Sequence, residues 1–456
     1  MSSVKRVLIA NRGEIAVRVV RACRALGIES VVVTSTADRD GMAARLADRA
    51  VCIGPGPASQ SYLVTDNVLS AALGAGCDAV HPGYGFLSEN PEFAAACVGE
   101  GLVFIGPRPE AVAQAGDKAR ARELARSAGI PILSGSPVLE SAKDAVAAAG
   151  ELGYPVLLKA AAGGGGRGMS VVENETELAA RWPAAKAEAQ SAFGDGRLYV
   201  ERFIRNARHI EVQVLGDKHG NVIHLGERDC TLQRRHQKVV EESPAPNLPE
   251  DIRQDIRRSG VRFAEALELD SAGTVEFIYD ADTRDYAFLE FNARIQVEHP
   301  VTEMVTGVDL VAEQIRSAAG ERLRIKQEDV EISGHAIEVR ITTEDPARGF
   351  LPHPGTVTEW IAPAGDGLRV DSHCEPGYVV PPFYDSLLAK IIASGPTRDV
   401  AADRMVAALG GLRVTGVPTT ADFARAALDH PDFRAGTVTT DWIASRGLPD
   451  YLEKSA

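Results

Sequence analysis

Short apolar strands alternate with helical segments through the first hundred residues, and this alternation leaves few folds open to the chain. Residues 7–10 are an apolar strand, and the helix expected after it carries apolar residues at spacings of four, three and four from Ile15 onwards. Gly27 is a stop signal for that helix. The same pattern supplies further strands at 31–33, 79–80 and 103–105. It predicts a parallel α/β sheet of Rossmann-like topology, although the turn at 11–14 holds too few glycines for a dinucleotide site.

Composition and charge exclude several classes of protein. The 456 residues include 49 Lys and Arg against 63 Asp and Glu, a net charge of −14 that repels a phosphate backbone, so no nucleic-acid partner is expected. The longest stretch without a charged residue, 50–65, is interrupted by Gly and Pro and cannot span a bilayer. No signal-peptide core precedes the first strand, and the six cysteines form no CxxC pair. We therefore expect a cytoplasmic protein with no membrane segment.

A run of glycines at 163–166, followed by Arg167 and Gly168, is the strongest local signal. The residues before and after it are strand-like, so the run is expected at the tip of a hairpin. A dinucleotide fingerprint would need a helix after the glycines, and a P-loop would need Lys in place of Met169. The backbone N–H groups of a glycine flap beside Lys159 can close over a polyphosphate, and we interpret the run as a phosphate cover. The alternative is a mobile surface hairpin.

Two carboxylates and an amide lie on a predicted hairpin between residues 274 and 292. Alternation of side chains puts Glu290 and Asn292 on one face, and strand pairing can set Glu276 opposite or beside Glu290. Oxygen ligands of this kind suit a Mg²⁺ ion that bridges nucleotide phosphates. As solvated edge residues they would need no metal, but an unpaired charge within an apolar strand is costly, which favours the metal site.

Three polar residues alternate with apolar ones directly after this hairpin, in the segment RIQVEHP. By this alternation Arg294, Gln296 and Glu298 are expected to line one wall. A guanidinium beside a carboxylate can hold a small oxyanion while the carboxylate acts as a base. An ion-paired strand is the alternative, and the neighbouring hairpin of acids favours the site.

Charged residues also fall within segments that are otherwise apolar. The stretches 208–211, 227–230 and 233–238 mix acids and bases, and we interpret them as a packed polar network rather than a solvated tail. Arg340 lies within an apolar strand predicted at 336–342, so it needs a carboxylate or an anionic ligand as its partner.

Taken together, these motifs closely resemble those of biotin carboxylase, the ATP-grasp component of biotin-dependent carboxylases. The segments that carry the resemblance are NRGEIAVRV, HPGYGFLSEN, LKAAAGGGGRGM, ERDCTLQRRHQKVVEESPAP, FLEFNARIQVEHPVTE and PPFYDSLLAKII. The match runs from about Val4 to Thr440, nearly the whole chain, and so many long motifs in the right order make it highly specific.

The resemblance implies a fold of α/β and α+β class, the ATP-grasp fold. It places a Rossmann-like pre-ATP-grasp domain at 1–116 and an ATP-grasp section at 117–203, with a mobile glycine-rich lid at about 131–203. The rest of the ATP-grasp fold and the C-terminal catalytic domain occupy 204–447, and 448–456 is a tail.

The resemblance also implies a reaction in which ATP, bicarbonate and a biotinyl carrier give ADP, phosphate and carboxybiotin through carboxyphosphate. The residues expected to bind ATP are Lys118, Lys159, Gly165, Gly166, Glu201, Arg202, Phe203, Ile204, His209, Gln233, His236 and Ile278. Mg²⁺ or Mn²⁺ is expected at Glu276, Glu290 and Asn292. Bicarbonate and biotin are expected at Lys238, Arg294, Gln296, Val297, Glu298 and Arg340. Among these, Glu298 is the expected base, Arg294 orients the reaction, and Arg340 steadies the enolate-like oxygen of biotin.

Four positions depart from the family pattern: Ala162, Arg202, Ala293 and the Thr pair at 342–343. These changes are conservative in size or charge, so activity is expected to persist. Ala162 in the glycine run and Arg202 in place of a common Lys are expected to affect nucleotide affinity or lid closure.

The biotin itself is expected on another chain. None of the five methionines is followed by Lys, so the chain lacks the Met-Lys dipeptide that accepts biotin. The expected partners are a biotin carboxyl carrier protein or domain and a carboxyltransferase, and the resemblance suggests a homodimer. The final carboxyl acceptor stays open among acetyl-CoA, propionyl-CoA, a longer acyl-CoA and pyruvate. Whether the chain is a separate subunit or one domain of a larger protein is open too.

Other functions fit the sequence less well. A carboxylate ligase that uses an amine or ammonia would share the glycine flap and the metal acids, but the RIQVEHP and RRHQK segments favour bicarbonate and biotin. A silent ATP-binding scaffold would not need Glu298 and Arg340 beside the metal acids. A nicotinamide oxidoreductase is excluded because the only GxGxxG match has the wrong context.

Overall fold

The structure is a computed structural model that describes residues 4–161, 168–235 and 237–455. Three of the residues predicted to bind ATP, Gly165, Gly166 and His236, lie outside the described residues, as does Ala162.

A five-stranded parallel sheet with helices on both faces forms the N-terminal part, as the sequence predicts. The strand order is β3-β2-β1-β4-β5, and the bounds are β1 (Arg6–Ile9), β2 (Glu29–Ser35), β3 (Arg49–Gly54), β4 (Ala79–His81) and β5 (Val103–Phe104). The helices are α1 (Gly13–Leu26), α2 (Met42–Leu46), α3 (Thr65–Gly74), α4 (Pro91–Gly99) and α5 (Pro109–Gly116). Val7 and Ile9 pack with α1 on one face, whereas Leu8 packs with α3 and α4 on the other. The predicted stop at Gly27 is confirmed by its left-handed φ of 69° at the end of α1.

The edge strand β3 was not predicted from the sequence. Most of its residues are exposed or half-exposed because it has a neighbour on one side only, so its sequence lacks the apolar run of a buried strand.

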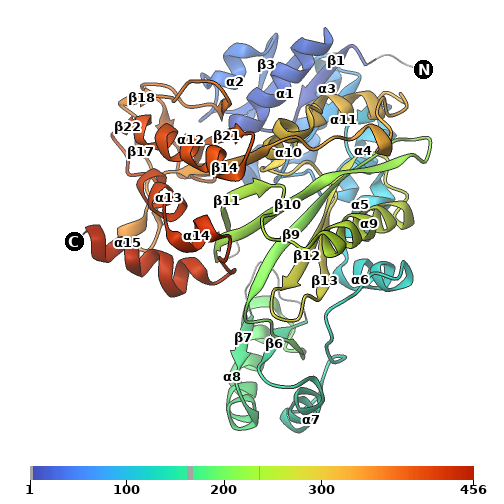
Figure 1. Cartoon of the computed structure of the whole chain (residues 1–456). Helices are drawn as coiled ribbons and strands as arrows, with labels where there is room; N and C mark the ends of the chain where they lie inside the picture. Colours follow the sequence, from blue (N-terminus) through green and yellow to red (C-terminus); the bar gives the residue numbers. More distant parts are fainter. Residues whose placement is uncertain (1–3, 162–167, 236, 456) are drawn as a thin grey trace.

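A small antiparallel sheet with two helices projects from the body at the lower end of the molecule (Figure 1). Its strand order is β7-β6-β8, with β6 (Val156–Ala160), β7 (Met169–Val172) and β8 (Leu198–Arg202). The helices α7 (Ala142–Leu152) and α8 (Glu175–Phe193) pack on it, and α6 (Lys118–Ser127) precedes this unit. The predicted hairpin is confirmed, since β6 and β7 pair up to Lys159 and Met169 on either side of the glycine run.

An antiparallel sheet of eight strands is the centre of the molecule. Its order is β13-β12-β9-β10-β11-β14-β21-β19. The bounds are β9 (Ala207–Gly216), β10 (Val222–Arg234), β11 (Gln237–Ser243), β12 (Ala272–Asp280), β13 (Tyr286–Asn292), β14 (His335–Thr342), β19 (Leu368–Ser372) and β21 (Leu387–Gly395). The helix α9 (Glu250–Ala266) covers an apolar face built from residues such as Val212 and Phe277. The helix α10 (His299–Thr306) packs on β10, β11, β14 and β21, and α11 (Leu310–Ala318) packs with α1.

The C-terminal part adds helices to the end of this sheet. They are α12 (Arg398–Gly411), α13 (Ala421–Leu428), α14 (Pro431–Ala435) and α15 (Leu448–Ser455). Three short strand pairs accompany them: β15 (Glu344–Asp345) with β16 (Leu351–Pro352), β17 (Gly355–Thr356) with β20 (Val379–Val380), and β18 (Glu359–Ile361) with β22 (Arg413–Thr415). The segment expected to be a tail, 448–456, is helical up to Ser455, and Tyr451 packs edge-on against Phe423.

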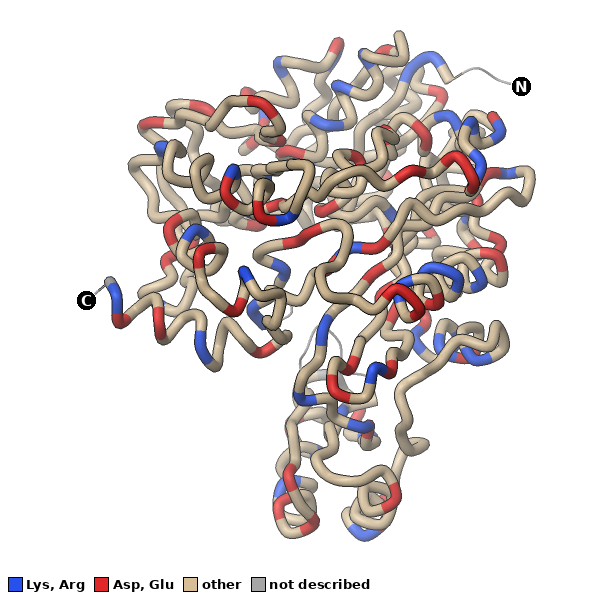
Figure 2. Tube along the Cα trace, in the orientation of Figure 1, with Lys and Arg blue, Asp and Glu red and all other residues tan. Residues whose placement is uncertain are grey.

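Charge is spread over the whole molecule, with Lys and Arg interspersed among Asp and Glu along the trace (Figure 2).

Among the described residues, no helix is long and apolar enough to cross a lipid bilayer. The domain boundaries given above stay a prediction.

Gly216, at the end of β9, offers a test of how tightly the central sheet is packed. A Cβ atom there would lie 2.0 Å from the carbonyl oxygen of Leu269, so the backbone would have to move. We expect Gly216→Ala to lower the free energy of unfolding by about 1–3 kcal/mol in urea titrations. The control is Gly150→Ala within α7, where a Cβ meets nothing within 4 Å and the substitution should be neutral or stabilising. Equal effects of the two variants would contradict this account.

Candidate active site

A row of charged side chains crosses four neighbouring strands of the central sheet. Glu290 on β13 stands opposite Glu276 on β12, Glu276 stands opposite Glu211 on β9, and Glu211 stands opposite Arg228 on β10. Cross-strand neighbours share a face, so these residues meet on the side of the sheet away from α9. The predicted placement of Glu276 against Glu290 is thus present in the register.

Lys238, on β11, lies at the centre of this charged face. Its Nζ is 2.5 Å from Glu211 Oε2, 2.5 Å from Glu298 Oε1 and 3.2 Å from Glu276 Oε1. Burial alone would lower the pKa of Lys238, but the acidic groups around it, Cys230 and the three carboxylates, raise it well above its usual value. The ammonium therefore stays charged and neutralises carboxylates that water does not reach.

Glu298 is completely buried and bound by two cations. One oxygen accepts a hydrogen bond from Lys238, and the other accepts one from Arg340 Nη2 at 3.0 Å. Burial would raise the pKa of Glu298, but Lys238, Arg340 and Arg228 outweigh it and hold the pKa well below its usual range. Glu298 is therefore ionised at neutral pH, the protonation state that a general base needs.

The segment 294–298 is a bend and a turn before α10, whereas its alternation of polar and apolar residues predicts a strand. Arg294 and Gln296 nevertheless lie together. Glu298 is linked to them through Lys238 and Glu276. Arg294 donates hydrogen bonds to Gln296 Oε1 and Asn292 Oδ1, each at 2.9 Å, and its Nε lies 2.9 Å from Glu89 Oε2. Gln296 in turn donates to Glu276 Oε1 at 3.3 Å, so the predicted wall joins the acid hairpin.

The donor set around Glu276 fits a divalent cation of the Mg²⁺ type. Glu276, Glu290 and Asn292 offer carboxylate and amide oxygens, the ligands such a cation prefers. Asn292 Nδ2 already donates to Glu276 Oε1 at 2.8 Å, and His209 Nε2 lies 3.1 Å from Glu276 Oε2. Ligand atoms of His209, Glu211 and Glu276 also come within 4.8 Å of one another, so a cation can be approached from two neighbouring strands.

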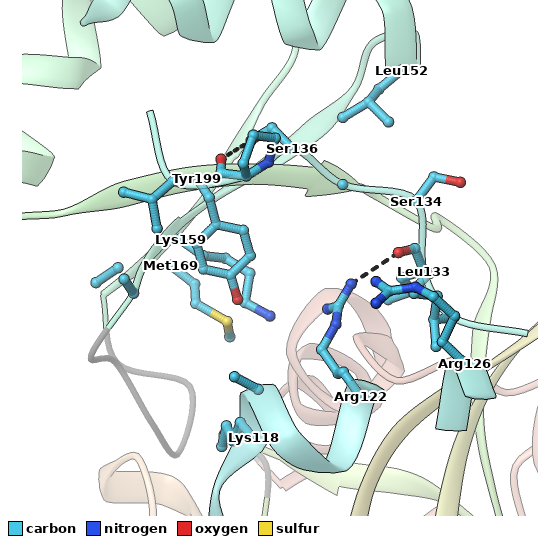
Figure 3. Close-up of a pocket in the computed structure, with 17 residues that line it drawn as sticks. Lys118, Arg122, Arg126, Leu133, Ser134, Ser136, Leu152, Lys159, Met169 and Tyr199 are labelled. Atoms are coloured by element: carbon cyan, nitrogen blue, oxygen red, sulfur yellow. Dashed lines mark hydrogen bonds between the residues drawn. The ribbon is translucent and has the colours of Figure 1, made fainter. Parts of the chain in front are cut away.

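A cavity of about 890 Å³ opens between α6 and the small three-stranded sheet (Figure 3). Lys118 and Lys159 line it, together with Arg122, Met169 and Tyr199. Burial would lower the pKa of Lys159, but Glu201, whose Oε2 is 2.7 Å from Nζ, and Tyr199 raise it. The cavity thus presents fixed positive charge, which suits a polyphosphate. It connects with the charged face through Lys118, whose Nζ is 3.6 Å from Glu290 Oε2.

The other residues predicted to bind ATP divide between two places. Arg202 and Ile204 line a second cavity of about 360 Å³, which shares residues 132–134 with the first, and Arg202 pairs with Asp280 at 3.2 Å. Gln233 stands opposite Lys238, and Ile278 stands opposite His209, so both lie on the central sheet. Phe203 follows β8 and is half-buried.

The sequence analysis expected Glu211 and Arg228 in a packed polar network but not in the site, and it did not single out Glu241. Arg228 is fully buried and binds Glu211 at 2.5 Å, which confirms the predicted polar network in this stretch. The signal for Glu211 was available, because His209, Glu211 and Gln213 occupy alternate positions of a strand whose other face is apolar.

Comparison with known proteins identifies the family. Three family models match in order: "Biotin carboxylase, N-terminal domain" at 3–112, "Carbamoyl-phosphate synthase L chain, ATP binding domain" at 117–326 and "Biotin carboxylase C-terminal domain" at 338–445. Biotin carboxylase 1 of Bacillus subtilis (strain 168) is 50% identical over 441 residues, which cover 96% of this chain and 98% of the relative.

The chain belongs to the biotin carboxylase family.

Members of this family are ATP-grasp ligases, and their known reaction is the carboxylation of biotin. The fold matches the biotin carboxylase domain dimer of Hydrogenobacter thermophilus 2-oxoglutarate carboxylase, solved with MgADP, ADP and bicarbonate, at a TM-score of 0.91. That structure is 47% identical and covers 97% of this chain and 98% of its own. A solved biotin carboxylase component of pyruvate carboxylase is 48% identical, with a TM-score of 0.86 and 98% of each chain covered. The ATP-grasp fold of α/β and α+β class predicted from sequence is confirmed.

Glu211 lies between Lys238 and Arg228, so removing its charge should unbalance the buried face. We expect Glu211→Gln to lower the free energy of unfolding by about 3–5 kcal/mol, because the two buried cations lose a shared carboxylate. Thermal and urea unfolding of the purified variant would measure this loss. The control is Glu268→Gln, whose side chain is 78% exposed beside Arg108 and should matter by less than about 1 kcal/mol. If Glu211→Gln were as stable as the control variant, the two buried cations would not depend on the carboxylate of Glu211, and the prediction would be wrong.

Proposed function

We propose that this chain carboxylates biotin borne by a separate carrier, at the expense of ATP and bicarbonate, with the buried Lys238–Glu298–Arg340 chain of ion pairs as its centre. The observation that carries the proposal is the position of Glu298, an ionised carboxylate between two cations, on a charged face that a cavity lined by Lys118 and Lys159 reaches through Glu290.

The phosphates of ATP are proposed to lie between the cavity and the acid hairpin. Lys118 and Lys159 would pair with phosphate oxygens, and the remaining residues proposed for ATP are Glu201, Arg202, Phe203, Ile204, His209, Gln233 and Ile278. The predicted residues Gly165, Gly166 and His236 belong to the same proposal. Glu276, Glu290 and Asn292 would hold Mg²⁺ or Mn²⁺, which neutralises charge on the phosphates when bound.

Bicarbonate is proposed to lie on the wall formed by Arg294, Gln296 and Val297, next to Lys238. Glu298 accepts the bicarbonate proton while an oxygen of bicarbonate attacks the γ-phosphate, so that ADP leaves and carboxyphosphate forms. Carboxyphosphate then breaks down to CO₂ and phosphate beside N1 of biotin. The released phosphate takes the N1 proton, and N1 attacks the CO₂ to give carboxybiotin. Arg340 would stabilise the enolate-like oxygen of biotin by its charge.

The partners proposed are a biotin carboxyl carrier protein or domain and a carboxyltransferase, with two copies of this chain forming a homodimer. The solved 2-oxoglutarate carboxylase domain described above is a dimer, which supports the last point. We propose acetyl-CoA or another acyl-CoA as the final acceptor, as in fatty acid synthesis, and the solved relative from pyruvate carboxylase makes pyruvate the alternative. The six free cysteines fit the reducing setting of the cytoplasm.

The proposed function is tested by measuring ADP release with Mg²⁺ATP, with and without bicarbonate and free biotin. Turnover that requires both substrates supports biotin carboxylation by this chain. Bicarbonate-dependent turnover that ignores biotin would contradict the proposed acceptor. Addition of a biotinylated carrier then tests whether the carrier replaces free biotin at a lower concentration.

Glu298 provides a second test of the proposed mechanism. We expect Glu298→Gln to bind MgATP like the wild type, because Glu298 contacts none of the cavity residues, and to lose carboxylation about a hundredfold to ten-thousandfold. Binding of a fluorescent nucleotide and carboxybiotin formation would be measured on the same preparation. Glu328→Gln, at a side chain that is 71% exposed, should leave both unchanged. Unchanged turnover in Glu298→Gln would remove Glu298 from the mechanism.

A further inference from the structure

Glu241 is a buried carboxylate on β11 that sequence alternation would place on the opposite face from Lys238. The register of β10 and β11 changes this, because Gln233 pairs with Lys238 whereas Leu232 pairs with Val240. One extra residue, Val239, therefore lies in β11 as a β-bulge, and the bulge brings Glu241 onto the face that carries Lys238.

On that face Glu241 shares one guanidinium with Glu298. Arg340 Nε donates a hydrogen bond to Glu241 Oε1 at 2.6 Å, and Arg340 Nη2 donates to Glu298 Oε2 at 3.0 Å. Glu241 has no exposed surface. Its second oxygen has no hydrogen-bond partner within the described part of the chain, so its only strong contact is the one with Arg340.

Glu338, on β14, stands directly opposite Glu241 and differs from it in its hydrogen bonding. Neither oxygen of Glu338 has a hydrogen-bond partner among the described residues, although the side chain is fully buried. Burial raises the pKa of both carboxyls, to about 7 at Glu241 and well above the usual value at Glu338, and the cation that opposes it most is Arg340 at Glu241 and Lys390 at Glu338. Glu241 is the member of this pair that binds the guanidinium of Arg340.

We propose that Glu241 is a positioning residue for the biotin half of the reaction: it anchors Arg340 at Nε, so that the far end of the guanidinium is held beside Glu298 and toward the biotin oxygen. The physical reason is that an arginine side chain bound at one nitrogen only can pivot about its many torsions, whereas two charge-assisted hydrogen bonds at different nitrogens fix it. The inference rests on the role proposed above for Arg340.

The test compares Glu241→Gln with Glu338→Gln in the full chain, using free biotin as the substrate. We expect Glu241→Gln to lower kcat/KM for biotin about tenfold to a hundredfold, the effect of losing a hydrogen bond between charged groups. The KM for MgATP and the bicarbonate-dependent release of ADP without biotin should change less than about twofold, because Glu298 keeps its ion pair with Lys238 when Arg340 loses the contact with Glu241. Glu338 makes no hydrogen bond to Arg340 among the described residues, so Glu338→Gln should behave like the wild type. Glu241→Asp keeps the charge and should recover part of the lost kcat/KM.

Three outcomes would overturn the inference. One is wild-type kcat/KM for biotin in Glu241→Gln while Arg340→Gln is impaired. Another is an equal loss in Glu241→Gln and Glu338→Gln, with lower kcat, unchanged KM for biotin and a lower Tm, which would indicate a structural role. If Glu241→Gln does not fold, Glu241→Met, which keeps the volume but removes the charge, serves instead, and a wild-type kcat/KM for biotin in that variant would overturn the inference. Wild-type turnover in Arg340→Gln would instead contradict the proposed role of Arg340.

Discussion

The contact between Lys238 and the three carboxylates Glu211, Glu276 and Glu298 is the interaction on which the rest of the structure depends. Removing several carboxylates from water is unfavourable unless cations replace the lost hydration. Lys238 and Arg228 supply that charge from the middle of the sheet, and Arg340 supplies it from the next strand. The same arrangement that makes the fold stable thus keeps a base ionised and cations fixed in a site from which water is largely excluded.

The candidate site forms where segments far apart in the sequence meet. The central sheet provides Lys238 on β11 and Arg340 on β14, which belong to segments about a hundred residues apart. The N-terminal part reaches it through Glu14, which lies 3.1 Å from the fully buried Lys390. Lys390 in turn donates a hydrogen bond to the carbonyl oxygen of Val297 at 2.8 Å, one residue before Glu298. The turn that holds the base is therefore tied to the N-terminal part of the chain through Lys390.

Much of the site could be predicted because simple strands keep a period of two. Glu276 and Glu290 were placed correctly for this reason, and Arg340 required an acidic partner because its strand is otherwise apolar. The failures have equally physical causes. Residues 294–298 alternate like a strand but form a turn, since no neighbouring strand pairs with them. Glu241 was missed because the bulge at Val239 reverses the alternation, and a bulge depends on the partner strand.

By itself the sequence determined the alternating elements of the N-terminal sheet, the hairpin around the glycine run and the set of charged residues that need buried partners. These follow from local periodicity and from the unfavourable free energy of an unpaired charge, both of which can be read along one chain. Only the tertiary structure decided which acid pairs with which base. Glu298 could have met any of several cations, and its pairing with Lys238 and Arg340 was decided by the register of β10, β11 and β14. Register arises from contacts between distant segments, and for that reason no local pattern contains it.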